Sequence, residues 1–367
     1  MRKYIPLKGG IPSVPTMSRM IASIDIDMLN YTFMAWVGSY ADTRGRDIAV
    51  DGKGLKAGTR KIMDEKTPYI LNAIDKQTGL VVGQMPIDGK TNEAGILPEF
   101  LRILQLEGSI VTIDAIGTTE RIMDTLHEMK AHFVLQVKMN CPVLYEEIKN
   151  LIEDLNREKE QDAEEFHKKY EDVYSDYAPF VEQNRERYEY RRMTEYHDPE
   201  GIKAFKEERP YIECVGLSRQ IRIKKIKDTD GNDITPGLKE FLEKGSSKQP
   251  LPKEGDGMSD SIQSVGIISD VILTAEEMAK IKRGHWSIEN SLHHVLDVTM
   301  GEDGCTIKKG RVAAATLRKC AYNIARILQQ GKYKALTLVV DVFDKIMNDL
   351  SLGLDLIFKP EQKSYRQ

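Results

Sequence analysis

Two classes of protein are excluded by what the sequence lacks. No uninterrupted apolar run approaches the roughly 18 residues that a bilayer-spanning helix needs. The N-terminal stretch MRKYIPLKGGIPSVP carries basic residues but no apolar segment after them, so it does not fit a secretory signal. We therefore predict a protein with no membrane partner, located in the cytoplasm.

Cysteine is also scarce, and its spacing excludes a disulfide framework and a zinc finger. No CxxC pair is present, and no histidine stands at a zinc-finger spacing from a cysteine. The HExxH pattern of zinc hydrolases is absent as well. We expect isolated thiols in a reducing compartment at Cys141, Cys214, Cys305 and Cys320.

Charge is nearly balanced over the whole chain but unevenly distributed along it. The formal net charge of −4 argues against a protein that coats nucleic acid. Residues 151–200 hold twice as many acidic as basic side chains, whereas the chain after Gly304 is basic on balance. Lys282 and Arg283 add a local basic pair, which suits a phosphate path or serves only to solubilise the surface.

The first half of the chain predicts alternating strands and helices. Three strands form an antiparallel meander, with KQTG (76–79) as a hairpin turn. The order β-β-β-α-β-α-β matches a ribonuclease H type of fold, in which a right-handed crossover lays the fourth strand beside the first. The expected elements are one or two helices in 16–40, strands 46–52, 67–75 and 80–88, a helix 92–108 capped by Asn92 and closed by Gly108, a strand 109–117, a helix 118–130 and a strand 131–138.

Two aspartates are expected at one edge of this sheet. Asp51 is predicted to end the first strand, and Asp114 lies late in the fourth. Asp51 also fits a simple Asp-Gly turn, but a carboxylate in the apolar stretch SIVTIDAIG is costly to bury unless a cation, a donor or water meets it. If the fold prediction holds, the two carboxylates become neighbours.

The stretch HWSIENSLHHVLDV (285–298) predicts a helix with an acidic group between two histidines. His285, Glu289 and His293 stand at i, i+4 and i+8 and would form one polar stripe, beside a core-facing row of Ile288, Leu292 and Val295. A solvated, salt-bridged face explains this spacing equally well. Trp286 is expected to be a core anchor rather than a base-stacking residue.

Together, Asp51, Asp114 and Glu289 supply three hard oxygen ligands of the kind that Mg²⁺ prefers. Two such ions can activate a nucleophile and stabilise the leaving oxygen in an in-line attack on phosphate.

The segment between the second aspartate and the glutamate is expected to be an insertion. Residues 145–210 are predicted as long, solvated helices, 214–231 as strand and turn, 245–261 as a loop, and 262–273 as a strand. Thr274 and Glu277 form a capping-box pattern that opens the next helix. The fold class is therefore α+β (mixed α/β), a ribonuclease H-like core with a large insertion, divided into 1–45, 46–144, 145–261, 262–330 and 331–367.

Four stretches carry a resemblance to a known family. They are GIPSVPTMSRM with FMAWV, IAVDGKGL, VTIDAIG with FVLQVKMN, and RGHWSIENSLHHVLDVTMGED, spread over most of the chain. The sequence resembles DDE-type insertion-sequence transposases of the H-repeat-associated (ISAs-type) family, and the His-Trp-x-Ile-Glu-Asn-x-Leu-His pattern is the most specific part of the match. The resemblance implies that Asp51, Asp114 and Glu289 are the catalytic, metal-binding triad.

The resemblance also implies supporting residues and partners. It implies Mg²⁺ as the cofactor, for which Mn²⁺ can substitute, and DNA ends and target DNA as partners of a homodimer or larger synaptic complex. Supporting metal-site or DNA contacts are expected at His285, Asn290, His293, Lys53, Lys138 and Arg283, and other recurrent positions of the family fall on Asn140, Asp297, Glu302 and Asp303.

Three departures from the family pattern leave alternatives open. Relatives usually carry a further helical segment before GIPS, and residues 116–119 read Ile-Gly-Thr-Thr in place of Met-Gly-Cys-Gln. His294 and Met300 replace a Trp and a Phe. The expected function is DNA strand cleavage and transfer during transposition. The alternative is a truncated or domesticated copy that binds DNA or a partner transposase without catalysis, and a junction-resolving or repair nuclease explains the carboxylates but not the HWSIEN pattern.

Overall fold

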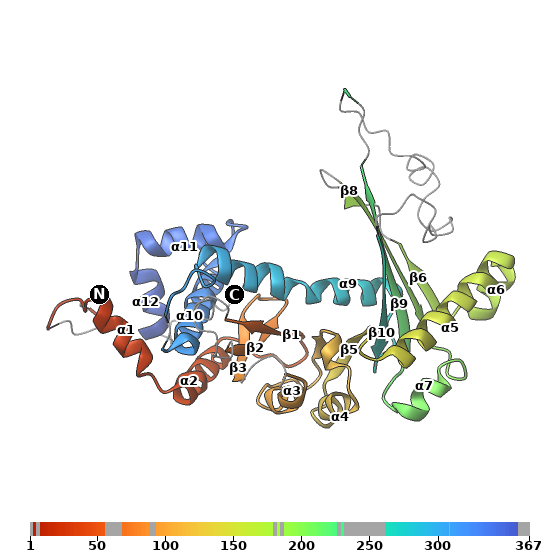
Figure 1. Cartoon of the computed structure of the whole chain (residues 1–367), viewed down its shortest axis with the longest axis horizontal. Helices are drawn as coiled ribbons and strands as arrows, with labels where there is room; N and C mark the ends of the chain where they lie inside the picture. Colours follow the sequence, from red (N-terminus) through yellow and green to blue (C-terminus); the bar gives the residue numbers. More distant parts are fainter. Residues whose placement is uncertain are drawn as a thin grey trace. The chain divides into compact units, whose positions relative to one another are not determined.

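The computed structural model forms two compact units (Figure 1). The first unit comprises Met1–Val111, Glu128–Ala131 and Gly284–Gln367, and the second comprises Thr112–His127 and His132–Arg283. No helix in the described part of the chain is long and apolar enough to cross a membrane. The structure describes residues 3–4, 8–55, 68–87, 93–178, 182–183, 187–225, 229–230, 261–307 and 309–358.

The first unit is built on the predicted antiparallel meander. Its strands are β1 (Asp47–Gly54), β2 (Tyr69–Asp75) and β3 (Val81–Ile87), and the strand order is β3-β2-β1 with β4 (Ile110–Ile113) next to β1. The KQTG hairpin is confirmed, because Asp75 accepts hydrogen bonds from Gln77 and Thr78 and Gly79 takes the positive φ that the turn requires.

Helices pack around this meander, and their bounds differ from the prediction at one place. Helix α3 ends at Arg102 instead of Gly108, because Ile103 and Leu104 switch to i→i−3 hydrogen bonds that close the last turn. The predicted cap Asn92 lies outside the described residues. The helices of this unit are α1 (Val14–Ala22), α2 (Ile26–Gly38), α3 (Glu93–Arg102), α10 (Arg311–Gln330), α11 (Val339–Asn348) and α12 (Ser351–Phe358).

Helix α10 is attached to the edge of β3 by one side chain. The Asn323 amide donates a hydrogen bond to the Val81 carbonyl and accepts one from the Val81 N–H, each at 2.9 Å. Both backbone groups of Val81 are thereby satisfied without another strand. This contact fixes the register of α10 on the sheet.

The second unit continues from β4 to β5, and the strands that follow β5 in the sheet pair antiparallel. Its strand order is β4-β5-β10-β9-β8-β6, with β7 pairing to β8. Helix α5 contacts β8, β9 and β10, as Figure 1 shows. The bounds are β5 (His132–Val137), β6 (Tyr174–Tyr177), β7 (Glu182–Gln183), β8 (Arg187–Tyr196), β9 (Cys214–Lys224), β10 (Ser261–Ser269), α4 (Glu120–Glu128), α5 (Pro142–Gln161), α6 (Ala163–Tyr170), α7 (Lys203–Glu208) and α9 (Ala275–His285).

Strand order confirms the expected fold. Three antiparallel strands come first, β4 lies beside β1, and β5 lies beside β4, which is the ribonuclease H-like arrangement. The chain between Asp114 and Glu289 supplies β6 to β10 and the helices among them, so the large insertion is also present.

The prediction of long helices over residues 145–210 is wrong in its second half. Helix α6 ends at Tyr170, the stretch RYEYRRMTEY forms strand β8, paired with β9 along its whole length, and only the short helix α7 follows within this range. Its aromatic side chains favour an extended backbone, and Tyr188 and Tyr190 are buried in the unit. The strand pattern was missed because the Glu and Arg residues between the aromatic ones are typical of a solvated helix.

The capping box at the start of α9 is confirmed and gives a first prediction. The Thr274 N–H donates to Glu277 Oε2 at 2.9 Å, and the Glu277 N–H donates to the Thr274 hydroxyl at 3.3 Å. The Thr274 N–H and the Thr274 hydroxyl both donate to the Glu277 carboxylate, and they lower its pKa below the ordinary value of 4.5. A lowered carboxyl pKa stabilises the fold above pH 4.5, and this contribution disappears as the pH falls through the folded value.

We expect Thr274→Ala to lower the free energy of unfolding by about 1 kcal/mol at neutral pH. The difference from the unchanged protein should shrink below pH 4.5, as measured by denaturant unfolding across a pH series. Thr32→Ala serves as the control, because this exposed hydroxyl bonds only back to the Met28 carbonyl within α2. An equal loss at every pH would contradict the assigned role of Glu277.

Candidate active site

Asp51 lies inside β1 and does not end it. The strand runs on to Gly54, and Asp51 is paired in register with Asn72 of β2. The prediction of a strand end here is wrong because β2 continues to pair with the Gly-Lys-Gly that follows. Gly52 is required at this point, since an added Cβ would lie 2.2 Å from the Tyr69 ring.

The helix that carries Glu289 is a π-helix, which changes the predicted stripe. Helix α9 ends at His285 and is followed by the π-helices η3 (Ile288–His293) and η4 (Val295–Thr299). The wider π turn separates side chains that an α-helix would align. Glu289 is exposed, whereas His285 is only 6% exposed, so the single polar stripe is wrong.

The predicted core-facing row of the same segment is confirmed, but the prediction that Trp286 is a core anchor is wrong. Ile288, Leu292 and Val295 are buried as predicted. Trp286 is 50% exposed, so it is not a core anchor. Asn290 is exposed in η3 next to Glu289. Single π turns of this kind occur frequently at functional sites.

His293 faces Asp51 as a neutral ring. Its Nδ1 lies 3.6 Å from Asp51 Oδ2, and its Nε2 is buried without a hydrogen-bond partner among the described residues. Burial, together with the nearby charges of Lys53 and Lys319, lowers the His293 pKa to about 3. At neutral pH the contact is therefore not an ion pair, and the Asp51 charge is not cancelled by this histidine.

Lys53 ties β1 to the segment that follows Glu289. Its ammonium is paired with Asp297 of η4 and lies 2.6 Å from Glu302 Oε2, and it reaches the His293 carbonyl at 3.5 Å. Glu302 is buried, so this pair has little competition from water. Burial raises the pKa of Asp297, although the Lys53 ammonium opposes that change. Lys53 lies two residues after Asp51, and its ammonium holds both π-helices against β1.

A second buried cation was not identified from the sequence. Lys319 of α10 is 2% exposed and donates to Gln84 Oε1 at 2.8 Å, while the Gln84 amide nitrogen donates to Asn30 and Thr316. Burial lowers the Lys319 pKa to about 7, and the nearby Glu302 charge opposes this shift. A sequence signal existed, because Thr316, Lys319 and Asn323 share one otherwise apolar helix face.

Asp114 belongs to the second unit and directly follows β4, so the prediction that it lies within the fourth strand is wrong: the strand ends at Ile113, and a 3₁₀ turn replaces its predicted last residues. Asp114 is the N-cap of the 3₁₀ helix η2 (Ala115–Gly117). Lys138 Nζ lies 2.8 Å from Asp114 Oδ1, and the two side chains are 42% and 50% exposed. Gly117 keeps this turn tight, since an added Cβ would lie 2.8 Å from Ile113 Cβ. Asp114 is therefore a half-exposed carboxylate on a rigid loop.

The turn around Asp114 is held by side-chain hydrogen bonds to backbone carbonyls. Asn140 Nδ2 donates to the Ala115 carbonyl at 2.6 Å, and the Thr118 hydroxyl donates to the Gln136 carbonyl at 2.7 Å. Thr118 belongs to the Ile-Gly-Thr-Thr stretch (116–119) that departs from the family pattern. Its hydroxyl therefore supplies a hydrogen bond that holds this turn. Arg283, the last residue of the second unit, is exposed.

Asp51, Asp114 and Glu289 each offer carboxylate oxygens, the ligand type that a hard divalent cation prefers. Within the described residues, no three or more His, Cys, Asp or Glu side chains are gathered into a metal-binding cluster. Asp51 and Glu289 both belong to the first unit, where β1 and η3 are in contact.

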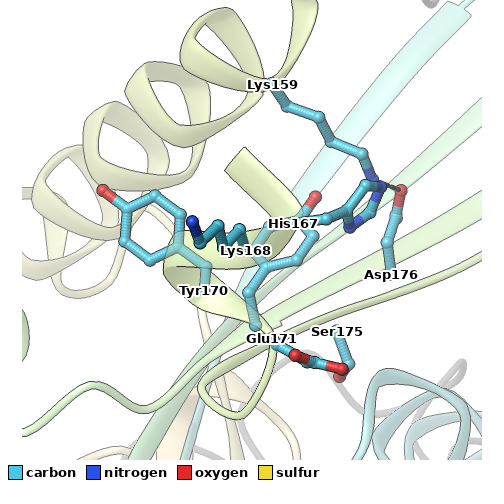
Figure 2. A pocket seen from close by; sticks show the side chains of 8 residues that line it. Lys159, His167, Lys168, Tyr170, Glu171, Ser175 and Asp176 are labelled. Carbon is cyan, nitrogen blue, oxygen red and sulfur yellow. Dashed lines mark hydrogen bonds and ion pairs between the residues drawn. The ribbon is translucent and has the colours of Figure 1, made fainter. Parts of the chain in front are cut away.

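A cavity of about 530 Å³ in the second unit contains none of these residues (Figure 2). Its carboxylate Asp176 is already bound by Arg192 and lies 3.5 Å from Lys159. Figure 2 shows this lysine and aspartate converging between helix and sheet. Asp176 is therefore already neutralised, and the cavity is lined by Lys159, His167, Lys168, Tyr170, Glu171, Tyr174, Ser175 and Asp176.

Comparison with known families identifies the class of protein. Residues 42–324 match the Transposase DDE domain, and the chain belongs to that family.

The most similar relatives place the chain more narrowly. It is 27% identical over 330 residues to "Putative transposase YncI" of Escherichia coli O157:H7, covering 89% of this chain and 74% of the relative. It is 26% identical over 328 residues to "H repeat-associated putative transposase YhhI" of Escherichia coli K12, covering 88% and 76%. The resemblance to H-repeat-associated transposases is confirmed.

A solved structure with a similar chain path is the piggyBac transposase in a synaptic complex with hairpin DNA. The TM-score is 0.42 at 12% identity, and the match covers 96% of this chain. This chain spans 62% of that protein, which is less than two thirds of its length.

The buried Lys319 ammonium gives the second prediction. Because its folded pKa is about 7 and its ordinary value is 10.5, the unfolded chain binds one more proton between these pH values. Stability should therefore rise with pH over this window. We expect Lys319→Met to raise the free energy of unfolding by about 1 to 3 kcal/mol at pH 6, with the gain shrinking towards pH 10.

Denaturant unfolding at several pH values measures both quantities. Lys345→Met, which removes an exposed lysine of α11, is the matched control and should show no such pH dependence. A destabilised Lys319→Met protein whose stability still rises between pH 7 and 10 as in the unchanged protein would disprove the assignment.

Proposed function

We propose that this protein catalyses metal-dependent DNA strand cleavage and strand transfer during the transposition of an insertion sequence. The carrying observation is that the chain belongs to the Transposase DDE domain family, and the three carboxylates that its sequence motifs single out support the proposal. Asp51 lies in a central strand, Asp114 on the loop after β4, and Glu289 on a π-helix. DNA ends and target DNA are the proposed substrates, acted on by a homodimer or larger synaptic assembly.

Asp51, Asp114 and Glu289 would hold Mg²⁺, or Mn²⁺ in its place. When bound, the metal would activate water or a DNA 3′-hydroxyl and stabilise the leaving oxygen at phosphorus. No covalent protein intermediate is needed, because the carboxylates act only as ligands.

The surrounding residues keep these ligands charged and in place. Neutral His293 contacts Asp51 without cancelling its charge, so the carboxylate keeps its attraction for a cation. Lys53 holds η3 and η4 against β1 and thereby positions the segment of Glu289. Lys138 balances the charge of Asp114 in the absence of another cation. Because His285 is buried, we assign it a role in supporting the fold of the π-helix and not in contacting a phosphate.

The third prediction concerns the exposed glutamate. Glu289→Gln keeps the shape of the side chain and removes its charge, so we expect cleavage of DNA carrying the element's ends to fall at least about a hundredfold. The measurement is Mg²⁺- or Mn²⁺-dependent cleavage beside equilibrium binding of the same DNA. Binding should be retained, because the surface of the protein is otherwise unchanged.

Glu276→Gln is the matched control, since this exposed glutamate of α9 is paired only with Lys280 on the helix surface. It should cut as the unchanged protein does. If the unchanged protein binds the ends and neither it nor any variant cuts them, the chain is a DNA-binding copy without catalysis, and the proposed activity is wrong.

A further inference from the structure

Trp286 is a large aromatic side chain that the core of the first unit leaves half exposed. Tryptophan is highly buried on average in folded proteins, yet this side chain is 50% exposed. The buried row of the same segment is made by Ile288, Leu292 and Val295, and Trp286 does not belong to it. About half of the indole surface is therefore available to a ligand.

Trp286 shares its exposed face with polar side chains of the π-helix η3 and its end. Glu289, Asn290 and His294 are all exposed. The Asn290 N–H donates to the Trp286 carbonyl at 3.1 Å, so these two residues lie one turn apart on one side of the helix. The His294 N–H donates to the Glu289 carbonyl, which places His294 one π turn after the glutamate. The indole thus stands at the start of a face that continues through the proposed metal ligand.

An exposed indole beside an amide suits an unpaired nucleobase. Every base has a flat π face that stacks on an aromatic side chain. The edge of a base carries hydrogen-bond donors and acceptors, which an asparagine amide can match. Bases inside a duplex already stack on their neighbours, so only an unpaired base has a face to offer. This face of the protein therefore suits single-stranded DNA better than intact duplex.

A protein partner matches this face less well. Protein interfaces place aromatic side chains in an apolar, water-excluding centre. Here the exposed residues that follow Trp286 are a carboxylate, an amide and an imidazole, and the next exposed apolar side chain of the segment is Val298. Val298 lies 12 positions further along, roughly 15 Å away along the helix axis. The segment therefore forms no continuous apolar patch around the indole.

The spacing between Trp286 and Glu289 sets which base the indole can reach. The two residues are three positions apart, which is roughly 5 Å along a helix axis. Successive nucleotides of one DNA strand are about 3.4 Å apart along the duplex axis. If a metal on Glu289 contacts a phosphate, the indole lies within reach of a base one or two nucleotides from that phosphate.

We propose that Trp286 stacks on an unpaired base of the DNA substrate beside the phosphate that is cut, and that Asn290 donates a hydrogen bond to the edge of that base. The inference rests on the proposed function, because Glu289 marks the place of the cut. It adds the state of the substrate that the site accepts, which is DNA locally unpaired at the cut. Stacking tolerates any base, so the site distinguishes unpaired from paired DNA and not one sequence from another.

The test is equilibrium binding of the full chain to a duplex with a short single-stranded gap and to the same duplex without the gap. Divalent metal is left out so that neither DNA is cut. We expect Trp286→Ala to weaken binding to the gapped DNA about tenfold and to leave binding to the intact duplex unchanged. Trp286→Phe should retain most of the affinity, because its ring still stacks.

Indole fluorescence gives a second readout that a merely structural role would not move. The chain has two tryptophans, Trp36 and Trp286. In a Trp36→Phe protein the emission comes from Trp286 alone, and stacking should quench it when gapped DNA is added. The reciprocal Trp286→Phe protein keeps only Trp36, which packs near Phe33 and Tyr40 in the first unit, and should show no quenching.

Tyr31→Ala is the matched control for the loss of an exposed ring. Tyr31 lies on α2 and is 73% exposed, so its removal changes the surface to a similar extent. It should bind gapped and intact DNA as the unchanged protein does. The quenching measurement does not require any alanine variant to fold, so it decides the matter even if Trp286→Ala is unstable.

The outcomes separate this inference from the proposed catalysis. If the unchanged protein binds DNA but its Trp286 emission is not quenched, or if Trp286→Ala binds the gapped DNA equally well, the inference is wrong and the cleavage proposal is untouched. A Trp286→Ala protein that changes its assembly state in sedimentation but keeps its preference for gapped DNA would assign the indole to a contact between copies and overturn the inference.

A different result would separate the two in the opposite direction. If the preference for gapped DNA depends on Trp286 but no DNA is cut when Mg²⁺ is added, the inference stands and the proposed catalysis fails. Absence of any DNA binding by the unchanged protein would overturn both.

Discussion

The candidate site of the first unit depends on the charge of Lys53. Asp297 and Glu302 would repel each other at close range, and the Lys53 ammonium between them turns that repulsion into a link to β1. Because π turns are less favourable than α turns, the segment that carries Glu289 needs this external support. Lys53, two positions after Asp51 in β1, therefore holds the helix that carries Glu289 close to Asp51.

Charge in this unit follows a consistent arrangement. The cations Lys53 and Lys319 are buried behind the site, the histidine beside Asp51 is neutral, and Glu289 is exposed. The negative charge is thereby concentrated where a metal would bind, while the buried ammonium groups lie on the interior side of the site.

Sequence patterns predicted those parts of the fold that local chemistry determines. The meander, its KQTG turn and the Thr274 capping box each depend on residues close together in the chain. Strand β8 was missed because its pairing with β9 decides its state, and charged side chains hid its period of two. The π-helices were missed because α and π turns share the same apolar spacing over so short a segment. Lys319 was missed because its burial depends on Gln84, more than two hundred positions away.

The Asn323 clamp on Val81 has a consequence for self-association. An edge strand with unpaired backbone groups is a template on which another chain can add a strand. At Val81 both backbone groups are already occupied by one amide side chain from within the same unit. Sheet extension between copies is blocked at this point of β3, so fibrous aggregation through this edge is disfavoured.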